Sequence, residues 1–211
     1  MCRLLAVRSP APVPITPYVE QFARLCRASR AYQGHGWGIT YRDVANQWIH
    51  YKNIAPIWDD DARQFPASRL FLVHARSAYR DEGIVVENNM PFYDADAIFL
   101  FNGELQGVRI KAEGRIGAEK IFRVIKRFYR GDMGEALRRG TALIRQRTRA
   151  IRAMNIIMAD TQRLYVSSFY TGDPDYFQMA VKHAEVMVVC SEPFPEDAGW
   201  QRLPNDSLHV F

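Results

Sequence analysis

Met1-Cys2-Arg3-Leu4-Leu5-Ala6-Val7 opens the chain, and residues 2–7 are typical of a β-strand that is buried on both faces. Cells usually remove the initiator methionine when the second residue is small, and here that residue is Cys2. Removal of Met1 would leave a thiol and a free α-amine on the same residue. An α-amine has a pKa of about 8, so near neutral pH part of it is an unprotonated base beside the nucleophile. The opening therefore predicts a buried strand that begins at a cysteine able to use its own amine as base.

Composition limits the classes of protein that fit. The chain has 211 residues, of which 48% are hydrophobic and 24% charged, and this suits a single globular domain. No apolar run approaches the roughly 20 residues that span a bilayer, and no charged segment leads into a long apolar one. The three cysteines are widely spaced and odd in number, which favours a reducing compartment over a disulfide framework. We expect a cytoplasmic protein that does not enter a membrane.

The net charge of +5 comes largely from an arginine-rich stretch over residues 138–152. Such a stretch is either a nucleic-acid patch or the solvated face of a helix. No aromatic residues interleave the arginines and no nucleic-acid motif accompanies them. We therefore favour the solvated helix and expect no nucleic-acid partner.

The order of predicted elements indicates an α+β protein. Residues 9–17 are expected to form a loop, and a helix is expected to follow it with Thr16 as N-cap and Pro17 in its first turn. Two further helices are predicted over 117–129 and 133–146. Strands before and after these helices suggest two sheets packed face to face, with helices outside. Apolar runs predict strands at 2–7, 37–41, 47–52, 70–74, 97–102, 154–158, 164–169, 177–180 and 186–190.

Several short segments carry side chains that chemistry could use, although each alone has an ordinary explanation. A glycine cluster could bind a dinucleotide, but such a loop opens a helix and this one leads into a strand. His74 could be a core histidine, Arg76 a surface arginine, and Asn102-Gly103 a hairpin turn. Five scattered histidines without paired ligand motifs predict no metal site. The segments are Gly34-His35-Gly36-Trp37-Gly38-Ile39, His74-Ala75-Arg76-Ser77-Ala78, Asn88-Asn89-Met90-Pro91-Phe92 and Phe101-Asn102-Gly103-Glu104-Leu105.

Cys2 followed by these four segments in this order resembles the sequence pattern of the class II glutamine amidotransferases, which are N-terminal nucleophile hydrolases. The resemblance is closest to the stand-alone members, and it extends to the tail residues 190–194 and 200–204. It implies a single glutamine amidotransferase type-2 domain over residues 1–211. It also implies a four-layer αββα sandwich of two mainly antiparallel sheets, and no cofactor.

The resemblance implies a role for each matching residue. Cys2 would attack the side-chain amide of glutamine or of a γ-glutamyl amide and form a thioester, with its own α-amine moving the proton. Asn102 and Gly103 would form the oxyanion hole. Arg76 would bind the substrate's α-carboxylate through two parallel hydrogen bonds. The other residues expected at the substrate are His74, Ala75, Ser77 and Glu104.

The chain departs from the family pattern at four positions, His35, Met90, Phe101 and Gly117. The last of these replaces an aspartate that binds the substrate's α-ammonium in the family. Glu104 and Glu119 are candidate replacements for the missing carboxylate. The departures keep a second hypothesis open, in which the fold is a catalytically silent binding or regulatory module. Because no acceptor domain is included, an active protein would either work with a separate synthase subunit or act alone on a small-molecule substrate.

Overall fold

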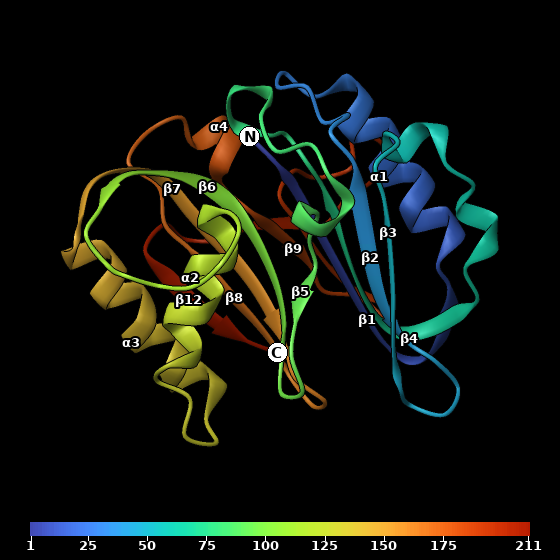
Figure 1. Ribbon diagram of the computed structural model, residues 1–211. Helices are drawn as coiled ribbons and strands as arrows, with labels where there is room; N and C mark the ends of the chain where they lie inside the picture. Colours follow the sequence, from blue (N-terminus) through green and yellow to red (C-terminus); the bar gives the residue numbers. More distant parts are fainter. The chain divides into compact units, whose positions relative to one another are not determined.

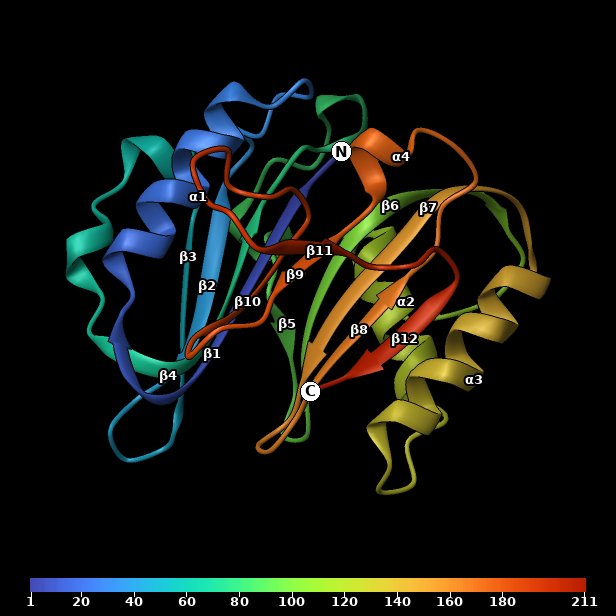
Figure 2. The same cartoon turned by 180° about the vertical axis from the view of Figure 1, so that it is seen from behind.

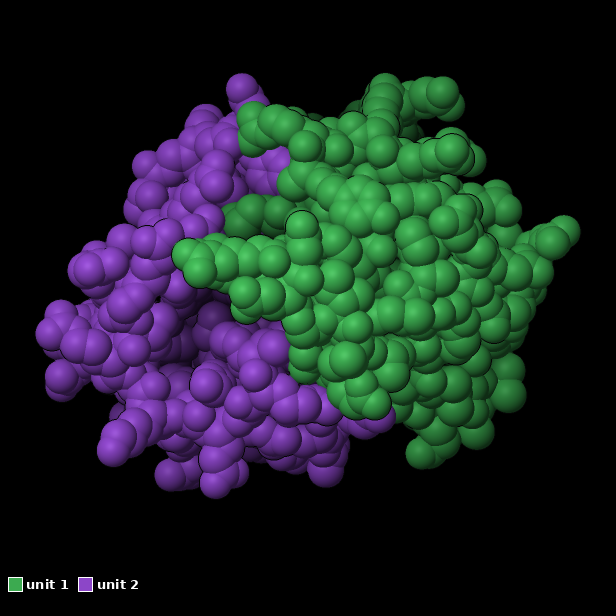
Figure 3. Space-filling model, turned by 45° about the horizontal axis from the view of Figure 1, so that its top comes forward, with its two compact units in different colours: residues 1–91, 178–203 green, residues 92–177, 204–211 purple.

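The computed structural model describes all residues, 1–211, and the chain divides into two compact units. Unit 1 comprises Met1–Pro91 and Gln178–Leu203, and unit 2 comprises Phe92–Phe177 and Pro204–Phe211 (Figure 3). Each unit is built on its own antiparallel sheet. None of the helices combines the length and apolar character that crossing a lipid bilayer requires.

Unit 1 contains a seven-stranded sheet in the order β11-β9-β10-β1-β4-β2-β3 (Figures 1 and 2). Strand β1 lies between β10 and β4, and its residues Leu4, Leu5, Ala6 and Val7 have no exposed surface. A strand that is covered on both faces needs apolar side chains at successive positions, which is why this stretch does not alternate. The bounds are β1 Arg3–Pro14, β2 Trp37–Arg42, β3 Trp48–Asn53, β4 Ala67–Ala75, β9 Ala180–Lys182, β10 Met187–Cys190 and β11 Trp200–Arg202.

Helix α1, Thr16–Ala28, packs on this sheet with one apolar stripe (Figure 1). Val19, Phe22 and Cys26 are each at most 1% exposed and share a core with Trp37 of β2. The predicted N-cap was wrong. Thr16 is the first helical residue, Ile15 precedes it without a side-chain cap, and the Thr16 hydroxyl donates instead to the carbonyl of Ala62. Short 3₁₀ turns follow at Ile57–Asp59, Ala62–Gln64, Tyr79–Asp81 and Val86–Asn88.

Unit 2 contains a five-stranded sheet in the order β12-β8-β7-β6-β5. Helices α2, Gly117–Lys126, and α3, Met133–Gln146, lie on one side of it (Figures 1 and 2). Gly140 allows the two helices to approach closely, because an added Cβ would lie 2.7 Å from the Cα of Ile125. The remaining elements are β5 Phe92–Tyr93, β6 Ile98–Val108, β7 Thr148–Ala159, β8 Leu164–Ser168, α4 Pro174–Phe177 and β12 Ser207–Val210.

The α+β class with two mainly antiparallel sheets is confirmed, and two local predictions besides the N-cap were wrong. The expected loop at 9–17 is largely strand, because β1 resumes pairing with β4 after a register shift and aligns Val13 with Ser68. The expected strand at 177–180 is instead the end of α4 followed by the first residue of β9. Phe177 and Met179 are fully buried, so their apolar run reflects core packing and not strand pairing.

Candidate functional site

Cys2 stands at the start of β1, opposite the end of β4. The ladder aligns Arg3 with Ala75, so the chain beyond β4 passes the cysteine side chain. The backbone nitrogen of Ser77 donates to the Cys2 Sγ atom at 3.4 Å, and the thiol faces the Ser77 carbonyl at 3.7 Å. The thiol therefore lies in a backbone pocket that offers both a donor and an acceptor.

The pKa of the Cys2 thiol is raised above its ordinary value. Burial is the main cause, because it disfavours the thiolate, while the Ser77 N–H, the positive N-terminus and Arg76 all lower the pKa. Near neutral pH the thiol is therefore protonated and needs a base to become a nucleophile. With Met1 in place the nitrogen of Cys2 is a peptide nitrogen, and the Met1 carbonyl accepts a 2.6 Å hydrogen bond from Gln33. The α-amine that could serve as base exists only once Met1 is removed.

Arg76 is a buried guanidinium without an anionic partner. It is 5% exposed, and its side chain donates to two carbonyls, Gly83 O at 2.9 Å and Glu82 O at 3.5 Å. No carboxylate pairs with it, and burial lowers its pKa because the charge is partly desolvated. A buried charge of this kind is costly unless it is paired, so the site suits a carboxylate ligand.

The residues after β4 are held by a second segment of unit 1, at His35-Gly36. The backbone nitrogen of Arg76 donates to Gly36 O at 2.9 Å, and that of His35 donates to Arg76 O at 3.1 Å. The Ala78 nitrogen donates to His35 Nδ1 at 2.9 Å. Gly36 has a φ of 99°, which favours glycine, and a Cβ there would lie 2.1 Å from the Asn89 amide nitrogen.

In unit 2, Asn102 carries a buried amide that is unsatisfied. The residue has no exposed surface, and neither its Nδ2 nor its Oδ1 atom has a hydrogen-bond partner. A buried polar group left unpaired costs about 1–3 kcal/mol, so nearly all such groups in folded proteins are satisfied. Asn102 therefore has a donor and an acceptor that the fold itself does not use.

Gly103 and Glu104 follow on β6, where the ladder to β7 becomes irregular. A Cβ on Gly103 would lie 2.1 Å from the Ala153 carbonyl oxygen, so the backbone of β7 leaves no room for a side chain. The register shifts directly after Glu104. The Glu104 carboxylate accepts from Gln106 at 2.7 Å and lies 3.6 Å from Arg152.

The carboxylates proposed to replace the missing aspartate are both engaged. Glu119 accepts from the backbone nitrogen of Arg115 at 2.8 Å and from its guanidinium at 3.1 Å, which lowers its pKa. Glu104 is paired with Arg152. At Gly117 a Cβ would meet nothing within 4 Å, so the position has room for a side chain that this sequence lacks.

The predicted site residues thus fall into two groups. Unit 1 brings together Cys2, Ala75, Arg76 and Ser77, with His74 fully buried in β4 between β1 and β2. Unit 2 holds Asn102, Gly103 and Glu104 consecutively on β6. Their joint action in one site stays a prediction, as does the reading of 1–211 as one domain.

Sequence reasoning missed the partners of these residues. His35 was noted only as a departure from a family pattern, and the carbonyls of Gly83 and Glu82 were not considered. The one available signal was the glycine on each side of His35, which indicates a tight turn. A turn does not reveal which distant backbone its side chain will bind.

No family model matches the chain, and no curated protein matches it in sequence. Solved structures do resemble it. A glutamine aminotransferase class-II domain protein from Silicibacter pomeroyi matches with a TM-score of 0.68 and 18% identity, over 99% of this chain and 94% of that one. A predicted glutamine amidotransferase from Pseudomonas aeruginosa matches with a TM-score of 0.60 and 15% identity, over 100% of this chain and 97% of that one.

A larger protein, described as the allosteric regulatory enzyme of purine biosynthesis, matches with a TM-score of 0.72 and 15% identity. The match spans 99% of this chain but 46% of that one. The chain thus has the α+β sandwich fold of class II glutamine amidotransferase domain proteins. Identities this low show the fold alone.

Proposed function

We propose that the protein is a cysteine amidohydrolase of the glutamine amidotransferase type, which hydrolyses the side-chain amide of glutamine or of a γ-glutamyl amide. The observation that carries the proposal is the pairing of a candidate nucleophile with a candidate carboxylate receptor in unit 1. Cys2 contacts the backbone of Ser77, and the neighbouring Arg76 is a buried cation without an anion. A substrate that has both an amide and a carboxylate fits this pair of groups.

The reaction begins once Met1 has been removed. The α-amine of Cys2 takes the thiol proton, and the sulfur attacks the amide carbonyl carbon. The resulting tetrahedral oxyanion is bound by the Asn102 Nδ2 donor and the Gly103 backbone N–H. The C–N bond then breaks, the protonated α-amine returns its proton to the leaving nitrogen, and a thioester remains on Cys2.

Water completes the cycle. The free α-amine takes a proton from water as its oxygen attacks the thioester carbonyl, and the thiolate leaves and is reprotonated. The products are the free side-chain carboxylic acid and ammonia or an amine. Arg76 keeps the α-carboxylate in place throughout, and the further residues proposed to contact the substrate are His74, Ala75, Ser77 and Glu104. The ammonia is either released or passed to a separate synthase subunit.

The alternative is a catalytically silent binding module with the same fold. One observation favours it, which is that burial raises the pKa of the Cys2 thiol and so suppresses the thiolate. The departures at His35, Met90, Phe101 and Gly117 point the same way. The unsatisfied amide of Asn102 favours the enzyme, because a structural asparagine would be paired. For either function we propose a reducing, cytoplasmic setting, since all three cysteines are free.

The test combines intact-mass analysis with an assay. Protein shown by mass to lack Met1 is incubated with glutamine and a panel of γ-glutamyl amides, and ammonia or amine release is measured. We expect release that is lost in Cys2→Ala, and labelling of Cys2 by a glutamine-mimicking diazoketone while the buried Cys26 and Cys190 stay unmodified. No release and no labelling of Met1-free protein would support the silent module.

Two arginines, one on β4 and one directly after it, test the carboxylate receptor. Arg76 directly follows β4 and is buried, whereas Arg69 is an exposed residue of the same strand. We expect Arg76→Ala to raise KM by at least about tenfold, because it removes a charge-assisted pair, and Arg69→Ala to leave KM unchanged. Equal values of KM in the two variants would contradict the assigned role.

A further inference from the structure

His35 occupies a place in unit 1 that the reaction above does not use. Its Nδ1 atom accepts a 2.9 Å hydrogen bond from the backbone nitrogen of Ala78. The residue before Ala78 is Ser77, whose backbone nitrogen and carbonyl oxygen both face the Cys2 sulfur. The imidazole is thus one peptide unit away from the groups that contact the nucleophile.

The hydrogen bond defines the protonation state of the ring. Because Ala78 N–H donates to Nδ1, this nitrogen is unprotonated and the proton of the neutral ring is on Nε2. Nε2 faces a carboxylate oxygen of Asp81 at 3.5 Å. Burial lowers the pKa of His35, and Arg76 and the positive N-terminus lower it further, while Asp81 opposes them. The neutral ring that the hydrogen bond requires is therefore the form present at pH 7.

The ring is also held from other sides. The Tyr32 ring packs edge-on at 4.9 Å between centroids, and only 12% of the His35 side chain is exposed. The backbone nitrogen of His35 donates to Arg76 O, which fixes the base of the residue to the same segment that the ring binds. Two separate hydrogen bonds from one residue therefore hold the chain at positions 76 and 78, on either side of Ser77.

We propose that His35 is a positioning residue for Cys2, whose neutral ring holds the Arg76–Ala78 backbone so that the Ser77 N–H points at the sulfur. The inference rests on the proposed function only for the identity of what Cys2 attacks. An N–H aimed at sulfur stabilises the thiolate, which partly offsets the effect of burial on the thiol. Protonated His35 cannot accept from Ala78, so acid releases the segment.

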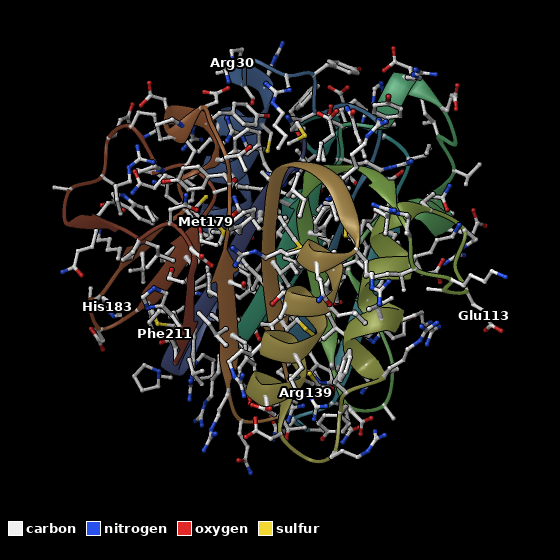
Figure 4. The ribbon with its side chains drawn as sticks, turned by 90° about the vertical axis from the view of Figure 1, so that its left-hand side faces the viewer. Arg30, Glu113, Arg139, Met179, His183 and Phe211 are labelled. Carbon is white, nitrogen blue, oxygen red and sulfur yellow. The ribbon has the colours of Figure 1, made fainter.

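The experiment measures the ionisation of Cys2 directly and does not depend on amide hydrolysis. The rate of alkylation of Cys2 by iodoacetamide is followed from pH 6 to 10 by peptide mass analysis of the full chain, with the buried Cys26 and Cys190 as internal controls. The variants are His35→Ala, which removes the acceptor, and His35→Asn, whose amide oxygen replaces Nδ1. His183→Ala, on the exposed hairpin between β9 and β10, is the matched control (Figure 4).

We expect His35→Ala to raise the midpoint of the alkylation profile by about half a pKa unit to one unit, the equivalent of one hydrogen bond. His35→Asn and His183→Ala should keep the midpoint of the unmodified protein. A profile that is unchanged in His35→Ala, or shifted equally in His35→Asn, overturns the proposal. If His35→Ala does not fold, His35→Gln replaces it, since its longer amide reaches the Nε2 position and misses Ala78.

A second measurement separates this proposal from the proposed function. Amide hydrolysis, measured at a single pH where the α-amine is in the same state in all variants, should be slower in His35→Ala than in His35→Asn, because only the second variant keeps an acceptor for the Ala78 N–H. If no amide is hydrolysed but the alkylation midpoint shifts as expected, the positioning role stands and the proposed reaction fails. If hydrolysis occurs and the midpoint does not shift, the reaction stands and the positioning role fails.

Discussion

Asn102 on β6 and Asn155 on β7 are the same side chain at the same burial, directly opposite each other in one antiparallel ladder. Both polar atoms of the Asn155 side chain form hydrogen bonds. Its Nδ2 donates to Phe177 O at 2.6 Å, and its Oδ1 accepts from Phe169 N at 3.2 Å and from the Ser168 hydroxyl at 3.3 Å. Asn102 has no side-chain partner at all.

The difference separates a structural from a functional use of the same residue. Asn155 links the end of α4 and the chain after β8 to the centre of the sheet, so its amide stabilises the fold. The Asn102 side chain forms no hydrogen bond within the fold, which leaves its amide available to a ligand at a cost in stability. Burial alone does not distinguish the two residues, because both have no exposed surface.

The largest expected effect is on turnover in Asn102→Ala. If Nδ2 stabilises the oxyanion, its removal should lower kcat by about 10²–10³-fold, the usual loss for one such donor. KM should change little, because the interaction forms mainly in the transition state. Steady-state kinetics on the preferred amide measure both constants, and a kcat within a few-fold of the original would exclude the oxyanion role.

The next effect is on stability in Asn155→Ala. Removing the Asn155 amide leaves the Phe177 carbonyl and the Phe169 N–H without this hydrogen-bond partner, so the free energy of unfolding should fall by about 2–4 kcal/mol. Urea denaturation measures this fall. Asn102→Ala is the matched control, and it should lose much less because no partner is stranded. Equal losses in the two variants would contradict the division between structural and functional asparagine.

A smaller change of opposite sign is expected in Asn102→Val. Valine suits a strand and contains no polar atom, so the unsatisfied amide disappears without leaving a partner behind. The free energy of unfolding should rise by about 1 kcal/mol while hydrolysis is lost. If this variant is destabilised instead, Asn102 has a structural role that its contacts do not reveal.

The last effect depends on pH and arises at the half-buried His50, which pairs with Thr40. The Thr40 hydroxyl and His50 Nδ1 are 2.7 Å apart, and burial lowers the pKa of His50 to about 4. In the unfolded chain His50 takes up a proton at about pH 6.5. The contribution of the buried neutral ring to the free energy of unfolding is therefore complete above that pH and is lost as pH falls towards 4. Urea denaturation at pH 7, 5.5 and 4.5 should show stability falling with pH, with a weaker fall in His50→Gln.

The regular elements were predicted well where local periodicity decides them. Helix α3 begins and ends at the predicted residues 133 and 146, since Asp132 caps it and its apolar stripe recurs at helical spacing. The strand at 177–180 failed, because Phe177 and Met179 are buried by packing from a helical turn and a loop. The arginine-rich segment is helix and strand surface, with Arg139 on α3 (Figure 4).

The sequence predicted which residues belong to the candidate site, but it did not predict their hydrogen-bond partners. Arg76 and Asn102 were named, but nothing local indicated that one would bind only backbone carbonyls or that the other would be left unpaired. His35 lies more than forty residues before the Ala78 nitrogen that it accepts from. Such contacts depend on which strand ends meet, and periodicity carries no information about that.

The sequence by itself determined the buried first strand, the three longer helices, the alternation of strands and helices, and a cysteine beside the N-terminus, because each depends on side-chain chemistry within a few residues. Only the tertiary structure decided that the Ser77 backbone meets the Cys2 sulfur, that Arg76 has no anion, and that Asn155 is satisfied while Asn102 is not. These are outcomes of long-range pairing, in which the partner of a polar group is set by the packing of whole strands.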